Sequence, residues 1–125
     1  MKAVVSAVLA ATLPLVARAT VPEQVRFTGV VVSDDAVAVN FDLVVPRGKQ
    51  TALELDNGTR LELGTGGVAP DGEGARMRLL APDGGVMHQA GNPDPAVAEL
   101  RFGYRVCEGR TTYMNPLPET VPSCP

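Results

Sequence analysis

Apolar and polar residues alternate along almost the whole chain from residue 20 onward, and turn-forming residues interrupt the alternation at short intervals. A period of two sends successive side chains to opposite faces of an extended strand, so the pattern is typical of strands with one buried face. Apolar residues at helical spacing do not form a convincing stripe. The sequence therefore predicts an all-β fold, an antiparallel β-sandwich or a small barrel of about seven or eight strands.

The first hairpin of this pattern is expected to turn at Asp34-Asp35, between residues 24–33 and 36–45. Alternate residues from Val37 to Val45 are apolar and form one face, which we expect to be core. Counting outward from the turn pairs Val30 with Val39 and Val32 with Val37.

The loop length of a second hairpin follows from its leucines and charges. Residues 51–55 and 59–63 flank Asp56-Asn57-Gly58. A two-residue turn would put leucines and charges on the same face, whereas a three-residue turn closed by a glycine bulge separates them. We therefore predict the longer turn, with Leu53 opposite Leu61 and Glu54 opposite Arg60.

The segment Ala81-Pro82-Asp83-Gly84 has the residue order of a type I turn with a left-handed exit. The same three-residue register sets Leu80 against Val86 and Leu79 against Met87. His88, the only histidine, is then expected opposite Arg78, pointing away from the core.

The clearest alternation runs from Ala96 to Cys107. Glu108-Gly109 is expected to turn the chain into a last strand, Arg110 to Met114, which places Tyr113 opposite Tyr104. The predicted inward-facing residues are Ala96, Ala98, Leu100, Phe102, Tyr104 and Val106, and the opposite face carries Glu99, Arg101, Arg105 and Cys107.

Residues 1–19 have the composition of a cleavable export signal. Lys2 is positive, Ala3 to Val16 form an apolar run, and Ala17-Arg18-Ala19 offers small residues at a cleavage site. We expect a mature chain of residues 20–125 that forms a single domain. Basic residues are mostly arginine and Ala, Val, Gly and Pro are abundant, which is typical of a GC-rich bacterial source and favours the periplasm, or secretion, as the location.

The two cysteines, Cys107 and Cys124, are expected to bond to each other in such an oxidising compartment. In the chain-entropy model, a disulfide that closes the loop between these two cysteines stabilises the folded protein by about 3 kcal/mol. Three prolines inside the loop stiffen the unfolded chain and reduce that gain. The alternative is a pair of buried or reactive free thiols.

The formal net charge is −3, and it becomes more negative when Lys2 and Arg18 leave with the signal. An acidic chain gains little from counterion release, so we expect no nucleic-acid partner. A membrane anchor is not expected either, because no later apolar run approaches the roughly eighteen residues of a membrane span.

The sequence predicts no catalytic residues, no metal and no cofactor. No motif ties a nucleophile or an acid to His88, and one histidine with two bonded cysteines offers too few ligands for zinc. The acidic segments Asp34-Asp35 and Asp71-Gly72-Glu73 are typical of surface turns.

Arg101 and Arg105 lie on the predicted outer face of the clearest strand, with Tyr113 and the proline-rich end of the chain nearby. Arginine and tyrosine are enriched at protein interfaces, so these three residues are the candidate partner-binding site. The alternative is that charges on exposed strands prevent association between sheets.

From Leu100 the chain reads Leu-Arg-Phe-Gly-Tyr-Arg-Val-Cys-Glu-Gly-Arg-Thr-Thr-Tyr-Met-Asn-Pro. This segment resembles the end of the immunoglobulin-like periplasmic domain of the thiol:disulfide interchange (transmembrane reductase) family. Cys107, Tyr113 and Pro116 match that pattern, whereas Thr112 stands where the family has its second cysteine. The resemblance implies an immunoglobulin-like sandwich, and redox activity would need two thiols close enough to cycle.

These observations predict a non-enzymatic periplasmic or secreted domain that binds another envelope or secreted protein. An inhibitor, an immunity factor and an accessory subunit of an envelope assembly are examples of the class. The alternative is a periplasmic thiol-disulfide redox domain that uses Cys107 and Cys124.

Overall fold

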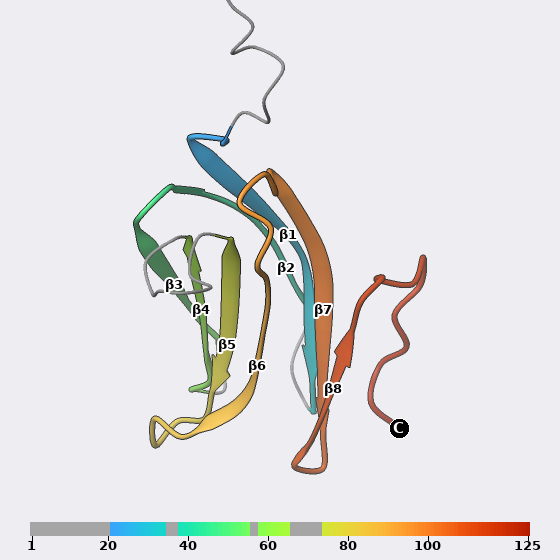
Figure 1. Ribbon diagram of the computed structural model, residues 1–125. Coiled ribbons are helices and arrows are strands. Elements are labelled where there is room, and N and C mark those ends of the chain that lie inside the picture. Colours follow the sequence, from blue (N-terminus) through green and yellow to red (C-terminus); the bar gives the residue numbers. More distant parts are fainter. Residues whose placement is uncertain (1–20, 35–37, 56–57, 66–73) are drawn as a thin grey trace, which may run out of the picture.

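The computed structural model describes residues 21–34, 38–55, 58–65 and 74–125, which form an all-β sandwich of two four-stranded sheets (Figure 1). Sheet A has the strand order β2-β1-β7-β8 and sheet B the order β3-β4-β5-β6. The strands are β1 (Gln24–Ser33), β2 (Val39–Pro46), β3 (Gln50–Glu54), β4 (Arg60–Thr65), β5 (Ala75–Leu80), β6 (Val86–Asn92), β7 (Glu99–Cys107) and β8 (Arg110–Met114).

The predicted β-sandwich is thus confirmed. The proposed signal, residues 1–19, lies outside the described residues. Within the described part of the chain, no helix has the length and apolar character needed to cross a membrane.

Sheet B is antiparallel throughout, but sheet A contains one parallel pair, β1 with β7. The chain leaves sheet A after β2, builds sheet B, and returns as β7 from the end at which β1 also begins (Figure 1). The expectation of purely antiparallel pairing was therefore wrong for this pair. Local alternation does not specify the direction in which a distant strand returns.

The β3–β4 hairpin has the predicted three-residue loop. Leu53 pairs with Leu61 and Glu54 with Arg60. The N–H of Gly58 donates to the carbonyl of Leu55 at 3.0 Å, and Gly58 has a φ of 87°, in the left-handed region. A side chain there would be strained, so the glycine fits the bulge that closes this turn.

The β1–β2 register differs by one residue from the prediction. Val39 lies opposite Val31, and Val30 lies opposite Asn40, while Val37 falls outside the described residues. The reason is that Val30, Val31 and Val32 are all buried, at 8%, 3% and 4% exposure. Since both faces of this end of β1 are apolar, alternation could not determine its register.

The β5–β6 hairpin pairs Leu80 with Val86 as predicted, but a bulge follows. Leu79 therefore lies opposite His88 rather than Met87, and Arg78 lies opposite Gln89. One extra residue in β6 moves every later side chain to the other face. The outward orientation expected for His88 was wrong, and its ring contacts the buried Tyr104.

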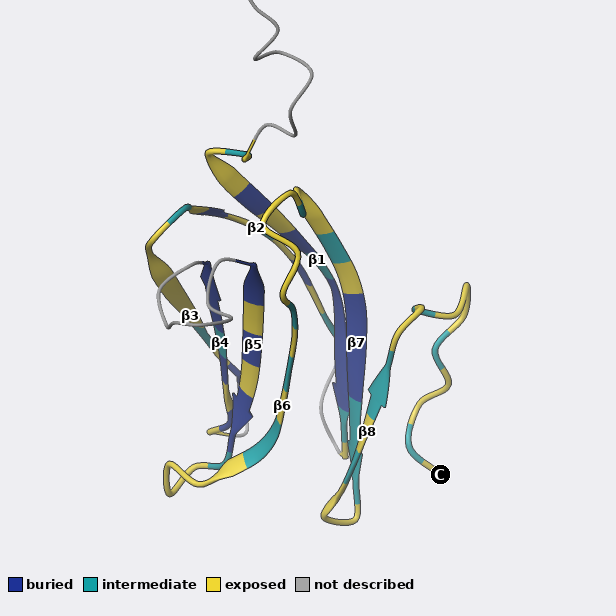
Figure 2. Cartoon of the chain, in the orientation of Figure 1, coloured by how far each residue is buried: buried dark blue, intermediate teal, exposed yellow. Residues whose placement is uncertain are grey.

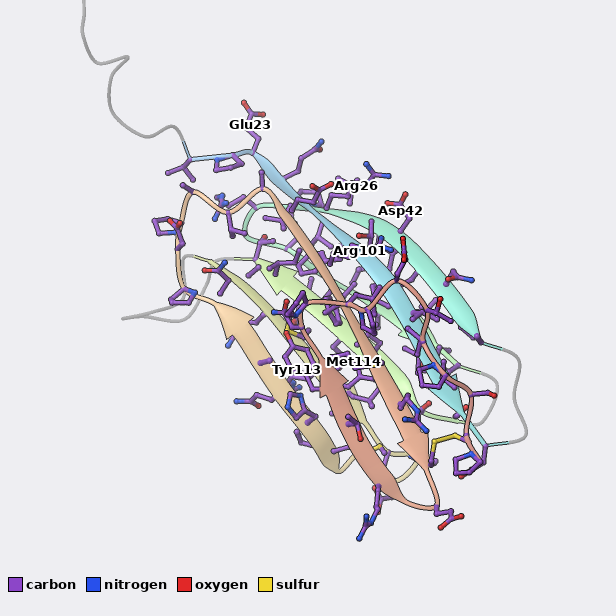
Figure 3. All side chains as sticks on the ribbon, turned by 90° about the vertical axis from the view of Figure 1, so that its right-hand side faces the viewer. Glu23, Arg26, Asp42, Arg101, Tyr113 and Met114 are labelled. Carbon is purple, nitrogen blue, oxygen red and sulfur yellow. A yellow bond between two sulfur atoms is a disulfide. The ribbon has the colours of Figure 1, made fainter. Side chains whose placement is uncertain are left out.

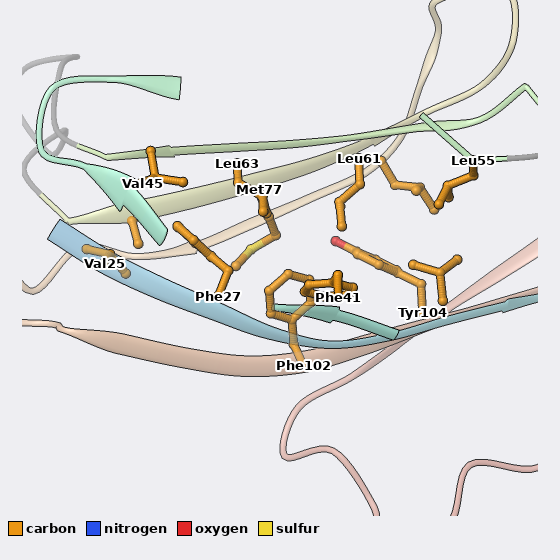
Figure 4. Close-up of a cluster of buried hydrophobic side chains, with 13 residues drawn as sticks. Val25, Phe27, Phe41, Val45, Leu55, Leu61, Leu63, Met77, Phe102 and Tyr104 are labelled. Atoms are coloured by element: carbon orange, nitrogen blue, oxygen red, sulfur yellow. The ribbon is translucent and has the colours of Figure 1, made fainter. Parts of the chain in front are cut away.

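The core lies between the two sheets. Along β5, buried and exposed residues alternate from Ala75 to Leu79 (Figure 2). From sheet A, Phe27, Phe41, Phe102 and Tyr104 face the aliphatic side chains of sheet B (Figure 4). The inward orientation predicted for Phe102 and Tyr104 is confirmed by their exposures of 1% and 0%.

The last two strands also agree with the prediction, except at the start of β7. Tyr104 pairs with Tyr113, and Leu100 and Val106 pack against the core cluster. Ala96 and Ala98, however, are exposed and precede the strand, which begins at Glu99. They follow Pro93 and Pro95, which lack the N–H that a strand ladder needs.

Replacing Leu61 by Ala is expected to lower the free energy of unfolding by about 2–5 kcal/mol, because it opens a cavity in the packed layer. Leu61 is 0% exposed, whereas Val44 on the outer face of sheet A is 50% exposed. Urea unfolding of both variants measures the difference, and Val44→Ala should stay within about 0.5 kcal/mol of the unmodified protein. Similar losses in the two variants would contradict the packing described.

Candidate functional site

A disulfide attaches the C-terminal end of the chain to sheet A. Cys107, at the end of β7, is bonded to Cys124, which confirms the predicted pair. Residues 115–125, called the tail below, lie on the side of sheet A that faces away from sheet B (Figure 1). We call that side the outer face of sheet A.

The tail covers an apolar patch on this outer face. Val30 and Val32 are only 8% and 4% exposed although they point away from the core. Leu117 packs on Gly103, and a Cβ added to Gly103 would lie 2.6 Å from the Leu117 Cδ1. The glycine therefore allows the tail to approach the middle of β7 closely.

A cavity of about 530 Å³ lies between the tail and the first two strands. Its floor is contributed by β1 and β2, and its wall by the tail and by Arg101 from β7. The lining residues used below are Thr28, Val30, Asp42, Arg101, Leu117 and Val121. A cavity of this volume falls within the range of natural ligand sites.

One end of this outer face is charged (Figure 3). Arg26 donates to both carboxylate oxygens of Asp42, at 2.8 and 2.5 Å, and lies 3.9 Å from Glu99. The hydrogen bonds with Arg26 hold the pKa of the Asp42 carboxyl below its ordinary value, and Asp42 in turn raises the pKa of Arg26. These charges are therefore already paired.

Arg101 belongs to the same charged end but has no ion pair within the described residues. It lies beside Thr28 of β1, it is exposed, and among the described residues no ion pair or hydrogen bond involves its guanidinium. A cation at the mouth of a partly apolar cavity can bind an external carboxylate through two parallel hydrogen bonds.

Arg105 contacts the tail rather than open solvent. Its guanidinium donates to the carbonyl of Ser123 at 3.4 Å. Its Nε is buried and has no hydrogen-bond partner among the described residues. Arg105 is therefore placed to hold the tail against the sheet.

Tyr113 lies on the opposite side of sheet A from Arg101 and Arg105. Its ring stacks on His88, with centroids 4.8 Å apart, and packs against Tyr104 at 5.3 Å. Asn115 Nδ2 donates to the Tyr113 hydroxyl at 3.1 Å. The structure thus brings Arg101 and Arg105 to one face and places Tyr113 at the margin of the core.

His88 is part of this aromatic cluster. Its Nδ1 and the Tyr104 hydroxyl are joined by a hydrogen bond of 3.0 Å. Burial raises the pKa of the Tyr104 hydroxyl well above its ordinary value, and the nearby Tyr113 adds to the effect. Within the described part of the chain, His88 contacts these two tyrosines and neither a serine nor a carboxylate.

The disulfide lies beside one carboxylate. Asp34 comes within 4.8 Å of both sulfur atoms, and these three side chains are the single group in the described residues with the spacing of a metal site. The two sulfur atoms are bonded to each other, and Asp34 Oδ2 accepts the N–H of Glu108 at 2.6 Å. The arrangement therefore orients the β7–β8 turn and does not offer thiolate ligands.

Comparison with known proteins adds no relationship: no family model, no curated protein and no solved structure matches the chain.

Sequence reasoning missed the contact between Leu117 of the tail and Gly103 of β7, and the cavity between the tail and β1. A glycine within an otherwise regular strand, Gly103, was the available signal, because such a residue often marks the close approach of another segment. The three consecutive valines of β1 were a second signal, since they require cover on both faces of the sheet.

Replacing both Cys107 and Cys124 by Ala is expected to lower the free energy of unfolding by about 2–3 kcal/mol, because the open chain gains conformational entropy when unfolded. Hydrogen exchange at Val30 and Val32 should also become faster, since the tail covers them. Urea unfolding and exchange of the purified variant test both effects. Unchanged stability together with unchanged exchange would show that the tail is held without the disulfide.

The stability of the protein is expected to fall as the pH rises above about 10, the ordinary tyrosine pKa. There the unfolded chain releases the Tyr104 proton while the folded protein, in which that pKa is raised, retains it. Stability then decreases by up to about 1.4 kcal/mol per pH unit. Tyr104→Phe should flatten this slope between pH 10 and 11.5, apart from a pH-independent offset for the lost hydrogen bond, and equal slopes would contradict the assignment.

Proposed function

We propose that the protein is a non-enzymatic domain that works outside the cytosol and binds another protein through the outer face of sheet A. The observation that carries this proposal is the tail, which the disulfide holds across that face beside a cavity of about 530 Å³. Arg101, which forms no ion pair with the part of the chain that the structure describes, stands at the charged end of the same cavity.

The tethered tail supports binding because it lowers the entropy that a partner must overcome. A free C-terminal segment would have to be ordered on association, whereas a segment held at Cys124 and Leu117 is already placed. The cavity combines apolar side chains from β1 and the tail with a polar margin. This composition resembles the core and rim of protein interfaces.

Arg101 indicates that the partner contributes a negatively charged side chain. Arg26 next to it is already neutralised by Asp42, so among the described residues that line the cavity Arg101 is the cation that remains available. The expected contact on the partner is an acidic side chain that enters beside the tail.

The proposal places the protein in the periplasm or the extracellular medium. Support comes from the disulfide between Cys107 and Cys124, since such bonds persist in oxidising compartments. The signal-like composition of residues 1–19 agrees with this location.

Asp34 favours binding over the redox alternative. Its carboxylate lies within 4.8 Å of both sulfurs, and a negative charge repels the thiolate that thiol-disulfide exchange requires. A disulfide that holds a binding surface has no need of that thiolate.

Site-specific photo-cross-linking in the native cell tests the binding function. A cross-linking amino acid replaces Thr120, which lines the cavity, or Thr51, which is exposed on β3 of sheet B. A discrete cross-linked protein is expected from position 120 and not from position 51. Arg101→Glu should reduce its yield about tenfold or more, whereas Arg110→Glu, the same charge change on β8, should not.

Two results would count against this function. Equal cross-linking from both positions, or equal loss with both arginine variants, would indicate non-specific contact. A single-cysteine variant, Cys124→Ser, tests the redox alternative separately, because a redox partner would be trapped on Cys107 as a mixed disulfide that non-reducing gels resolve.

A further inference from the structure

The outer face of sheet B, the side away from sheet A, carries a hollow of its own. Its volume is about 610 Å³, and sheet B lies on the opposite side of sheet A from the tail (Figure 1). The residues that the argument uses are Gln50, Glu62, Gly64, Arg76, Gln89 and Gly91, which come from all four strands of the sheet.

Two glycines beside Arg76 create the hollow. In the row of residues that crosses the sheet, Gln50 pairs with Gly64, Gly64 with Arg76, and Arg76 with Gly91. Neither neighbour of Arg76 therefore has a side chain to fill the space. A Cβ added to Gly91 would lie 3.4 Å from the Arg76 Cγ, so the arginine stem runs close to the bare backbone of β6.

The other charges on this face are already neutralised. Arg60 lies 3.3 Å from Glu54 and 3.7 Å from Glu62, and Arg78 donates to Glu62 Oε1 at 2.7 Å. Glu62 is the single carboxylate among the lining residues. Arg76 is exposed and makes no ion pair or hydrogen bond with the described residues, so within that part of the chain its positive charge in the hollow is uncompensated.

Side-chain amides stand on both sides of this charge. Gln50 from β3 and Gln89 from β6 line the hollow, and neither amide hydrogen-bonds to another described residue. Strands lie about 4.8 Å apart, so the four strands span about 14 Å. One small acid cannot reach both amides, whereas about four residues of extended peptide can.

We propose that this hollow binds a short, extended acidic segment of a protein partner, with a Glu or Asp carboxylate of that segment on the Arg76 guanidinium. The planar guanidinium suits a carboxylate through two parallel hydrogen bonds. Gln50 and Gln89 then bind peptide groups on either side of it. This site goes beyond the function proposed above, because it lies on the other sheet and involves neither Arg101 nor the tail.

Amide chemical shifts of the ¹⁵N-labelled, disulfide-bonded protein test the site. The probe is the blocked tetrapeptide acetyl-Ala-Glu-Ala-Ala-amide, and its Gln counterpart is the neutral control. Saturable shifts are expected at Gly64, Arg76 and Gly91 with the Glu peptide, and at least tenfold weaker binding with the Gln peptide. Sodium acetate and inorganic phosphate are titrated in parallel.

Three variants locate the interaction. Arg76→Gln should weaken binding of the Glu peptide about tenfold or more, and Gln89→Ala should weaken it about threefold while leaving the charge in place. Arg110→Gln removes the same charge from an exposed position on β8 of the other sheet and should leave binding unchanged. The shifts of core amides show that each variant is folded.

The proposal fails if the Glu peptide causes no saturable shift up to about 10 mM, the range of the weakest useful contacts. It also fails if Arg76→Gln and Arg110→Gln weaken binding equally, because the effect would then be general electrostatic attraction. If acetate or phosphate shifts the same amides with the same affinity, the hollow takes free anions and the peptide assignment is overturned. None of these outcomes bears on cross-linking from position 120, so the two proposals fail independently.

Discussion

The packing of the aromatic side chains of sheet A against sheet B determines which residues of sheet A face the core and which face outward. Phe102 and Tyr104 are almost fully buried and pack 5.8 Å apart, edge to face, a geometry that aromatic rings prefer. Because neighbouring strand residues point to opposite faces, burying these two rings turns Arg101, Gly103 and Arg105 outward. One packing requirement in β7 therefore sets the orientation of all the residues that the outer face uses: Arg101, the glycine that contacts the tail, and the arginine beside Ser123. The chain has no tryptophan, so few large side chains are available to satisfy that requirement elsewhere.

Much of this fold could be predicted from local patterns, and the differences have identifiable physical causes. The β3–β4 loop was predictable because one register separates leucines from charges and the other mixes them. The β1 register was not predictable. The tail covers the outer face of this strand, so its outward-facing Val30 is as apolar as the residues that face the core, and alternation does not show which side faces inward. The bulge near His88 was not predictable either, because inserting one residue leaves the alternation on each side of it intact. Each difference arises where a contact distant in the sequence outweighs a local preference.

The candidate sites were less predictable than the fold for the same reason. The outward orientation of Arg101 followed from alternation, but its lack of a partner depends on Asp42 being already paired with Arg26 across two strands. Tyr113 was grouped with the arginines by its position in the sequence, although its predicted partner Tyr104, confirmed by the structure, lies on the inner side of the sheet. The hollow beside Arg76 could not be anticipated, because it requires glycines from two different strands to fall in register with it.

The parallel pairing of β1 with β7 has a consequence for the order in which the molecule assembles. Sheet B consists of consecutive hairpins, whereas sheet A needs contacts between the two ends of the chain, such as that of Asp34 with Glu108, 74 positions apart. Contacts so distant carry a large loop-closure entropy and form slowly. We expect strands β3–β6 to associate before β7 pairs with the first hairpin. Until then, the edge of β1 that later pairs with β7 has no hydrogen-bonding partner.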